Sequence, residues 1–323
     1  MIDKLRQSLG EQVKENEILA NYVTFKIGGP ARYFYAAKTK ADLVKAIAAA
    51  QELKLDYFIL GGGSNLLVSD QGFNGLVIKQ DNIDFKIDGT TVYAQAGALV
   101  TDVLRATLEA GLIGWAWAAG LPGTIGGAVR GNAGAYGQGM SNILKSAEIY
   151  YQAKVQIYTN EQMGFSYRHS LAKGQPIIIL SVVLELQKGD TVKDLAQVKK
   201  YEQYRSDTQP QDLPNAGCIF KNIDLSTVEV NKARVIKALD VTEAEYDEKT
   251  KFGKLPVSFI FDRLNLKGKT MGGAQVSEKH GAFIVNIGQA RADQVIMLMS
   301  DLKMRVRNQL GIQLQEEVQF IGF

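Results

Sequence analysis

Short segments of β-branched and aromatic residues recur along the chain and predict strands. They lie at Tyr57–Ile59, Leu66–Val68, Leu76–Ile78, Val92–Ala96, Ile149–Ile157, Ile177–Leu186 and Ala282–Asn286. Alternation on both sides of Gly28, Gly29 and Pro30 predicts two further strands and a tight turn within Tyr22–Tyr35. The tail Ile312–Phe323 also predicts a strand, and it carries Glu316 and Glu317.

Apolar residues spaced three and four apart predict helices between these strands. Thr39 is placed to cap a helix that continues to about Leu53. The strongest pattern covers Ala290–Leu310, where apolar residues share one face and Gly311 follows the last turn. Further helices are expected within Gly97–Leu112 and Val192–Tyr204, and residues 1–20 predict a polar helical extension. This mixture of elements indicates an α+β protein.

Composition restricts the classes of function. A chain of 323 residues indicates two or three domains, and 46% hydrophobic with 22% charged residues is ordinary for a globular protein. The net charge of +3 is spread without a basic block, which argues against nucleic acid. The longest apolar run, Ile177–Leu186, is too short to span a bilayer. One cysteine and two histidines allow neither an internal disulfide nor a metal cluster. We expect a cytoplasmic protein without a membrane partner.

The stretch Gly120–Gly137 is the most unusual part of the sequence. It reads GLPGTIGGAVRGNAGAYG and holds seven glycines, one proline and no Asp, Glu or Lys. Glycine loses the most conformational freedom on folding, so this density favours backbone at positive φ or backbone lying close against a ligand. We interpret the stretch as a ligand cradle rather than a merely structural loop.

A second glycine run, Gly61–Gly63, leaves the predicted strand Tyr57–Ile59 and leads into Ser64 and Asn65. Successive amides in such a turn can converge on an anion. The run matches neither the dinucleotide fingerprint nor the P-loop pattern. A tight hairpin turn explains the glycines equally well, so both interpretations stay open at this point.

Seven segments together resemble the UDP-N-acetylenolpyruvoylglucosamine reductase family, which performs the reductive step in making the muramic acid of peptidoglycan. The segments run in family order across nearly the whole chain. They are NYVTFKIGGPARYF (Asn21–Phe34), ILGGGSNLLVSD (Ile59–Asp70), GLPGTIGGAVRGNAGAYG (Gly120–Gly137), FSYRHS (Phe165–Ser170), GCIFKN (Gly217–Asn222), GGAQVSEKHGAFIVN (Gly272–Asn286) and LQEEVQFIG (Leu314–Gly322).

The resemblance implies a two-part FAD-binding domain of the vanillyl-alcohol-oxidase type, followed by a C-terminal α+β substrate-binding domain. The expected division is an extension at 1–20, an FAD-binding domain at 21–190 with subdomains of about 21–80 and 81–190, and a substrate-binding domain at 191–323. The residues expected to bind FAD are Gly61, Gly62, Gly63, Ser64, Asn65, Leu66, Gly123, Thr124, Gly126, Gly127, Ala128, Asn132 and Ala135.

The reaction implied by the resemblance passes a hydride from NADPH to FAD and then to the enolpyruvyl C3, with protonation at C2. Arg168 matches the family arginine that would neutralise the substrate carboxylate, and Glu317 the glutamate that would stabilise the enolate. Cys218 stands where the family usually has a serine proton donor. A thiol, with a pKa of about 8.5, gives its proton more readily than an alcohol. Tyr167 and Asn222 match substrate-contacting positions.

Each catalytic assignment has an ordinary alternative. Outside the family pattern, Arg168 reads as a surface ion pair and Cys218 as a small buried cysteine. Glu316 and Glu317 would face opposite sides of a strand, so only one can point at the substrate, and the family pattern selects Glu317. We expect His169 and His280 to be structural, and Trp115 and Trp117 to be core residues.

Two departures from the family pattern stand out. Ile223 follows Asn222 where the family commonly has proline, and the charged segment 224–254 predicts an insertion. A solvated helical excursion is favoured there over a mobile cover. Only 50 residues separate Arg168 from Cys218, which indicates the shorter subgroup, without an extra substrate loop.

The expected protein is a monomeric NADPH-dependent flavoenzyme of peptidoglycan precursor synthesis, with roles in cell wall biogenesis, cell shape and cell division. Another oxidoreductase of the same fold, such as a sugar or lactone oxidase, is the first alternative. A flavin-binding protein without catalytic activity is the second.

Overall fold

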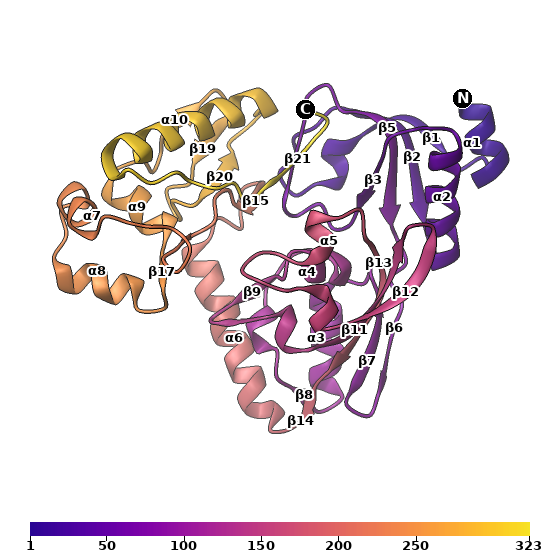
Figure 1. The fold of residues 1–323 in the computed structure, drawn as a ribbon, viewed down its shortest axis with the longest axis horizontal. Coiled ribbons are helices and arrows are strands. Elements are labelled where there is room, and N and C mark those ends of the chain that lie inside the picture. Colours follow the sequence, from indigo (N-terminus) through magenta and orange to yellow (C-terminus); the bar gives the residue numbers. More distant parts are fainter. The chain divides into compact units, whose positions relative to one another are not determined.

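The computed structural model describes all residues, 1–323, and the chain folds into two compact units (Figure 1). Unit 1 comprises Met1–Glu17, Pro30–Gly63 and Phe73–Asp207. Unit 2 comprises Ile18–Gly29, Ser64–Gly72 and Thr208–Phe323. The chain therefore enters unit 2 twice before its final third remains there.

A four-stranded sheet opens unit 1, with the strand order β1-β2-β5-β3. Strand β2 is parallel to β5, and β5 is parallel to β3. Helix α2 packs on this sheet and α1 packs on α2. The predicted cap is confirmed, because Thr39 Oγ1 accepts a hydrogen bond from Asp42 N–H and the Asp42 carboxylate accepts one from Thr39 N–H. The bounds are α1 Ile2–Leu9, β1 Lys14–Ile18, β2 Pro30–Ala37, α2 Lys40–Glu52, β3 Tyr57–Leu60 and β5 Phe73–Gln80.

A five-stranded antiparallel sheet forms the rest of unit 1, in the order β12-β11-β13-β7-β6. Its core holds Trp115 and Trp117, both almost fully buried, which confirms their interpretation as core residues. Trp115 Nε1 donates to Thr107 Oγ1 at 3.0 Å. The bounds are β6 Phe85–Asp88, β7 Thr91–Gln95, α3 Val100–Glu109, α4 Ile125–Arg130, β11 Leu144–Tyr151, β12 Lys154–Thr159, α5 Leu171–Gly174, β13 Ile178–Glu185 and α6 Thr191–Thr208.

Three local predictions for unit 1 and its junctions are wrong. Residues Ile149–Ile157 form a hairpin of β11 and β12 rather than one strand, with Gln152 and Ala153 at positive φ in the turn. The extension at 1–20 is only partly helical, because β1 joins the sheet. Within Tyr22–Tyr35 only β2 is a strand.

Unit 2 is built on a four-stranded sheet, β15-β20-β19-β18, whose neighbouring strands are antiparallel. Two separate pairs complete it: β4 lies parallel to β21, and β16 antiparallel to β17. The tail prediction was too long, because its strand covers only β21. The bounds are β4 Leu66–Val68, β15 Asn215–Cys218, β16 Ile223–Asp224, α7 Lys232–Leu239, α8 Glu243–Thr250, β17 Lys254–Leu255, α9 Val257–Arg263, β18 Thr270–Met271, β19 Ala274–Val276, β20 Phe283–Asn286, α10 Ala292–Leu310 and β21 Gln319–Ile321.

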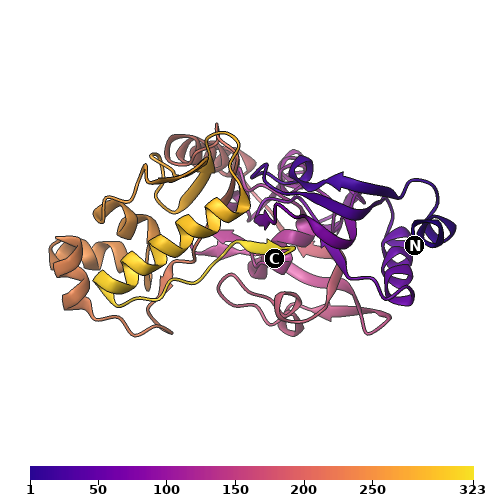
Figure 2. The ribbon, with the colours of Figure 1, turned by 90° about the horizontal axis from the view of Figure 1, so that it is seen from above.

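Helix α10 is the longest element of unit 2, and it matches the strongest periodic pattern in the sequence. Its apolar face, including Val295, Leu302 and Val306, is buried in the core of this unit. Gly311 ends the helix in the left-handed conformation, with φ 77°. The chain then turns back and runs along the helix to β21 (Figures 1 and 2).

The charged segment 224–254 packs into unit 2 and is not a purely solvated excursion. Its two ends pair as β16 and β17, and its helices bury Val235, Leu239 and Tyr246 in the core. Arg234 of α7 donates to the carbonyl oxygens of Asn308 and Gln309 at the end of α10, at 2.7 and 2.9 Å. A well-buried core explains why the excursion holds a defined structure.

The compact units follow packing, and they do not coincide with the predicted domains. Helix α6 belongs to unit 1, whereas the expected boundary precedes it, and 18–29 and 64–72 belong to unit 2. Because the predicted domains are defined by their ligands, that division stays a prediction. No helix has the length and hydropathy needed to cross a membrane.

Candidate active site

The two glycine loops of unit 1, Gly61–Gly63 and the loop around Gly123, lie in close contact. A Cβ built on Gly62 would lie 2.5 Å from Gly123 Cα, and one on Gly61 would lie 2.8 Å from Thr124 Oγ1. Gly123 itself has φ 105°, a conformation that favours glycine. Glycine at these positions therefore allows the two loops to pack closely against each other.

The hairpin interpretation of Gly61–Gly63 is wrong. Strand β3, before the run, pairs with β5 in unit 1, whereas β4, after it, pairs with β21 in unit 2. A hairpin would pair β3 with β4. The glycines therefore connect a strand of unit 1 to a strand of unit 2.

The glycine-rich stretch contains a short helix, which its sequence pattern does not predict. Helix α4 begins after Thr124, whose Oγ1 accepts a hydrogen bond from Gly127 N–H at 3.4 Å. Gly126 donates its N–H to Ala96 O, and a Cβ on Gly126 would lie 2.7 Å from Ala96 Cβ. Gly127 is exposed, and its Cβ would meet only Thr124 Oγ1, at 3.5 Å. Gly126 thus serves close packing, whereas Gly127 leaves free surface.

Asn132 connects the glycine-rich stretch to the turn that carries Arg168. Its Nδ2 donates to Ser166 O and its Oδ1 accepts from Ser141 N–H, both at 3.0 Å. Asn132 has φ 42°, a conformation that asparagine tolerates better than most residues. Nearby, Ser170 Oγ donates to Arg130 O at 2.7 Å. Two side chains therefore hold this turn beside α4.

Arg168 lies at the tip of that turn in a constrained backbone conformation. Its φ is 55°, and Ser166 pairs with His169 across the turn. Its guanidinium carbon lies 5.3 Å from the centre of the Tyr167 ring. Arg168 is half-buried, and Lys173 Nζ donates to its carbonyl oxygen at 3.1 Å. Strain at a non-glycine residue is typical of functional positions.

Cys218 lies at an irregularity in unit 2, where the register of β15 shifts against β20. Gly217 makes the irregularity possible with φ 77°, and its N–H donates to Asn215 Oδ1 at 2.9 Å. Cys218 forms no disulfide, and it is half-buried against the core of unit 2 rather than fully buried. A bulge of this kind can turn a side chain away from the regular strand pattern.

Glu317 lies on the segment next to Cys218. Its N–H donates to the carbonyl oxygen of Ile219 at 2.8 Å. The preceding residue, Glu316, forms a β-bridge with Phe220 and an ion pair with Lys303 of α10. Glu316 therefore has a cationic partner on α10. Lys303 is a contact that the sequence analysis missed, since nothing links residues 303 and 316 locally.

Asn65 connects an expected cofactor residue to an expected catalytic one. Its Nδ2 donates to Glu317 O at 3.1 Å, and its own carbonyl oxygen accepts from Gln319 N–H at 3.0 Å. Leu66 then pairs with Gln319 as β4 begins. In unit 2, Ser64–Leu66 are thus bound to the backbone that carries Glu317.

Asn222 has a structural contact of its own. Its Oδ1 accepts a hydrogen bond from Val257 N–H, at the start of α9, at 3.1 Å. The bond ties the residue before β16 to the first residue of α9, shortly after β17, so Asn222 closes the neck of the 224–254 excursion. Ile223, where the family commonly has proline, instead forms β16 and is buried.

The structural interpretation of His280 agrees with its contacts. Its Nδ1 accepts from Ala282 N–H at 3.3 Å, and its ring lies edge-on to Phe283. Burial lowers the pKa of His280; Lys267 adds to that effect and Asp262 opposes it. These contacts are those of a histidine that supports the local fold.

Comparisons with known proteins agree along the whole chain. A family model described as the UDP-N-acetylenolpyruvoylglucosamine reductase C-terminal domain matches residues 209–321, and an FAD binding domain model matches residues 31–156. The reductase of Lactobacillus delbrueckii subsp. bulgaricus is 37% identical over 97% of this chain and 96% of its own length. The reductase of Bacillus velezensis is 36% identical over 100% of this chain and 98% of its own length.

The crystal structure of UDP-N-acetylenolpyruvylglucosamine reductase from Thermus caldophilus has the same fold. It aligns with a TM-score of 0.74 and 30% identity, covering 95% of this chain and 98% of that one. These matches confirm the predicted α+β class, with an FAD-binding domain followed by the C-terminal domain of the reductase. The chain belongs to the UDP-N-acetylenolpyruvoylglucosamine reductase family.

Proposed function

We propose that this protein reduces UDP-N-acetylglucosamine enolpyruvate to UDP-N-acetylmuramate with NADPH and FAD, in peptidoglycan precursor synthesis. The observation that carries the proposal is the match to reductases of this name over nearly the full length of both chains. The match of residues 31–156 to an FAD binding domain model supports the cofactor assignment.

FAD would be held by Gly61–Leu66 and by Gly123, Thr124, Gly126, Gly127, Ala128, Asn132 and Ala135. Bound FAD supplies the redox chemistry by accepting a hydride from NADPH and passing it to C3 of the enolpyruvyl group. The work of the protein is to bind, orient and neutralise. All of these residues lie within the part of the chain that matches the FAD binding domain model.

Arg168 neutralises the substrate carboxylate in this proposal. Hydride addition at C3 places negative charge on C2 and the carboxylate, and a fixed cation lowers the free energy of that enolate-like species. A guanidinium is permanently charged and can bind a carboxylate through two parallel hydrogen bonds. The turn held by Asn132 and Ser170 supports the role, because it limits the motion of Arg168 before substrate arrives.

Cys218 donates the proton to C2, and Glu317 stabilises the enolate. A half-buried free thiol has a proton to give, and general acids of this kind accelerate such steps by about 10²- to 10⁴-fold. The family pattern selects Glu317, and Glu316 is held in an ion pair with Lys303. The shared contact at Ile219 keeps Glu317 on the segment next to Cys218.

Tyr167 and Asn222 contact the nucleotide-sugar substrate in this proposal. Tyr167 is adjacent to Arg168, and Asn222 is held by Val257 N–H at the neck of the excursion. We further propose that the enzyme is a cytoplasmic monomer with no nucleic-acid or membrane partner.

A single assay separates this function from its alternatives. Purified protein should be yellow, and its oxidation of NADPH should depend on UDP-N-acetylglucosamine enolpyruvate. Oxidation with oxygen alone would instead indicate an oxidase of the same fold. Bound flavin without turnover of either kind would indicate a binding protein without catalytic activity.

A further inference from the structure

A short segment of unit 2, Ser64–Gly72, lies against the backbone that carries Glu317, and we call it the strap. Its strand β4 pairs in parallel with β21, with Leu66 opposite Gln319 and Val68 opposite Ile321. The pairing continues beyond the strands, because Ser69 N–H donates to Ile321 O at 2.8 Å. The strap begins with residues that the proposed function assigns to FAD.

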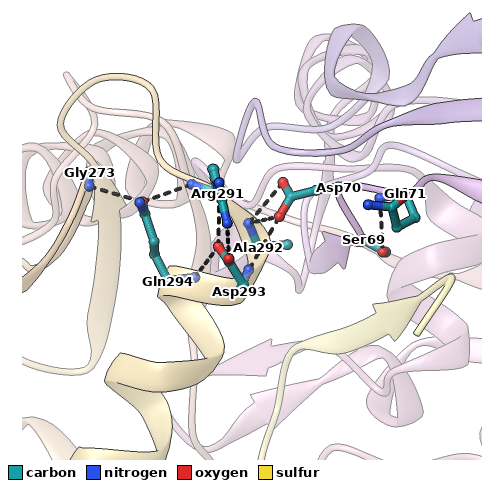
Figure 3. A network of polar contacts seen from close by, with 8 residues as sticks. All are labelled: Ser69, Asp70, Gln71, Gly273, Arg291, Ala292, Asp293 and Gln294. Atoms are coloured by element: carbon teal, nitrogen blue, oxygen red, sulfur yellow. Dashed lines mark hydrogen bonds and ion pairs between the residues drawn. The ribbon is translucent and has the colours of Figure 1, made fainter.

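Asp70 anchors the far end of the strap on the N-terminus of α10 (Figure 3). Its two carboxylate oxygens accept from Ala292 N–H at 3.0 and 2.9 Å, and one also lies 3.4 Å from Asp293 N. The first amides of a helix lack partners within the helix and carry partial positive charge, so a carboxylate is a favourable partner. α10 has no side-chain cap from Arg291, the residue at its N-cap position.

Helix α10 also contacts the residue next to Glu317. Lys303, three turns further along α10, forms the ion pair with Glu316. α10 is thus bound to the strap through Asp70 and to the tail through Lys303. Between these two anchors, Asn65 Nδ2 donates to Glu317 O. The backbone position of Glu317 therefore depends on a strap that is fixed at its end.

We propose that Asp70 is a positioning residue that, through the strap, holds Ser64–Leu66 and Glu317 in one fixed arrangement. Asp70 is exposed and acts through the strap rather than on the reacting atoms. Loss of its carboxylate frees the end of the strap and loosens the bond from Asn65 to Glu317. FAD affinity and the step that needs Glu317 fall together. The inference rests on the proposed function.

Gln294 offers a matched control at the same end of the same helix. Its Oε1 accepts from Arg291 N–H at 3.1 Å and from Gly273 N–H at 3.0 Å, and it has no contact with the strap (Figure 3). Gln294→Ala therefore weakens the start of α10 without releasing the strap. Asp70→Ala weakens the same helix end and also releases the strap.

The test compares Asp70→Ala, Asp70→Asn and Gln294→Ala by melting temperature, FAD dissociation constant and the rates of both half-reactions. We expect Asp70→Ala to weaken FAD binding and to slow flavin reoxidation by the enolpyruvyl substrate, each by about tenfold. A tenfold change corresponds to the upper range of interaction energies for one carboxylate at a helix terminus. Flavin reduction by NADPH should stay within about twofold, because it does not use Glu317. Asp70→Asn should recover part of both losses, since its amide oxygen still accepts.

A double-mutant cycle that combines Asp70→Ala with Asn65→Ala adds a second criterion. If both residues act through the strap, Asp70→Ala should slow reoxidation far less in an Asn65→Ala background than alone. Equal behaviour of Asp70→Ala and Gln294→Ala, or strictly additive effects with Asn65→Ala, would overturn the inference. Failure of the unmodified protein to reoxidise reduced flavin with the enolpyruvyl substrate would instead overturn the proposed function. The FAD dissociation constants would then still decide whether Asp70 holds Ser64–Leu66.

Discussion

Glu317 donates its backbone N–H to the carbonyl oxygen of Ile219, the residue directly after Cys218. This bond places the expected enolate-stabilising residue and the expected proton donor on neighbouring segments of one unit. The two residues are far apart in the sequence, and this backbone contact brings their segments together. The chemistry proposed for the two residues can therefore be tested by separate substitutions on a shared scaffold.

The thiol of Cys218 should be replaceable by another proton donor but not by a methyl group. We expect Cys218→Ser to keep substantial activity and Cys218→Ala to slow flavin reoxidation by the enolpyruvyl substrate about a hundredfold or more. Reduction of FAD by NADPH should be nearly unchanged in both variants. Stopped-flow absorbance of the flavin measures the two steps separately, and equal losses in both would rule out a donor role.

The two adjacent glutamates should differ in their effect on catalysis. Glu317→Gln should slow reoxidation about a hundredfold, the usual range for losing one group that stabilises developing charge. Glu316→Gln removes the partner of Lys303 and should cost about 1 kcal/mol of stability or less, because the pair is partly exposed. Rates and unfolding free energies of both variants provide the comparison. A larger kinetic loss for Glu316→Gln would reverse the assignment.

Asn132 should affect substrate binding through the Arg168 turn. Asn132→Ala removes the bonds to Ser166 and Ser141 and leaves a β-carbon at positive φ. We expect a rise in KM for the enolpyruvyl substrate of about tenfold, together with a loss of about 1–3 kcal/mol in stability. Asn132→Gly relieves the backbone strain but not the lost bonds. If its KM returned to that of the unmodified protein, the hydrogen bonds would not matter.

Substitutions at two glycines distinguish a packing role from a contact with the cofactor. Gly62→Ala places a methyl group 2.5 Å from Gly123 Cα, so it should destabilise the protein by about 1–3 kcal/mol even without FAD. Gly127→Ala fits an exposed helical position and should leave the FAD-free protein as stable or more stable, by up to about 1 kcal/mol. Its FAD affinity should nevertheless fall. Unchanged FAD binding by Gly127→Ala would remove Gly127 from the cofactor site.

His280 should make stability depend on pH in a predictable direction. Burial, helped by Lys267 and opposed by Asp262, lowers the pKa of His280 in the folded state. The unfolded chain, with a pKa of about 6.5, then binds the proton more readily. The contribution is fully present above about pH 6.5 and is lost as pH falls toward the folded-state pKa.

Denaturant unfolding of the native protein and His280→Gln between pH 5 and 8 measures this effect, with those limits taken as roughly the range in which histidine titrates. The native protein should lose more stability than the variant as pH falls. Protonation also removes the lone pair of Nδ1 that accepts from Ala282 N–H. Parallel pH profiles for the two proteins would contradict this account.

Features that depend on neighbouring residues were determined by the sequence alone. The cap at Thr39, the apolar face of α10 and the end of that helix at Gly311 each follow from residues within a few positions. The motifs were sufficient to indicate the family and the candidate site residues. Local patterns failed where one apolar run contained a turn, as at Gln152 and Ala153 between β11 and β12.

Only the tertiary structure decided how the site residues are held. Asn65 and Glu317 are 252 residues apart, and Asp70 binds a helix more than two hundred residues later, so no local pattern predicts either contact. Whether Gly61–Gly63 form a hairpin depended on the partners of β3 and β4, which lie elsewhere in the chain. Such contacts form only when packing offsets the entropy of closing long loops, and that balance belongs to the whole fold.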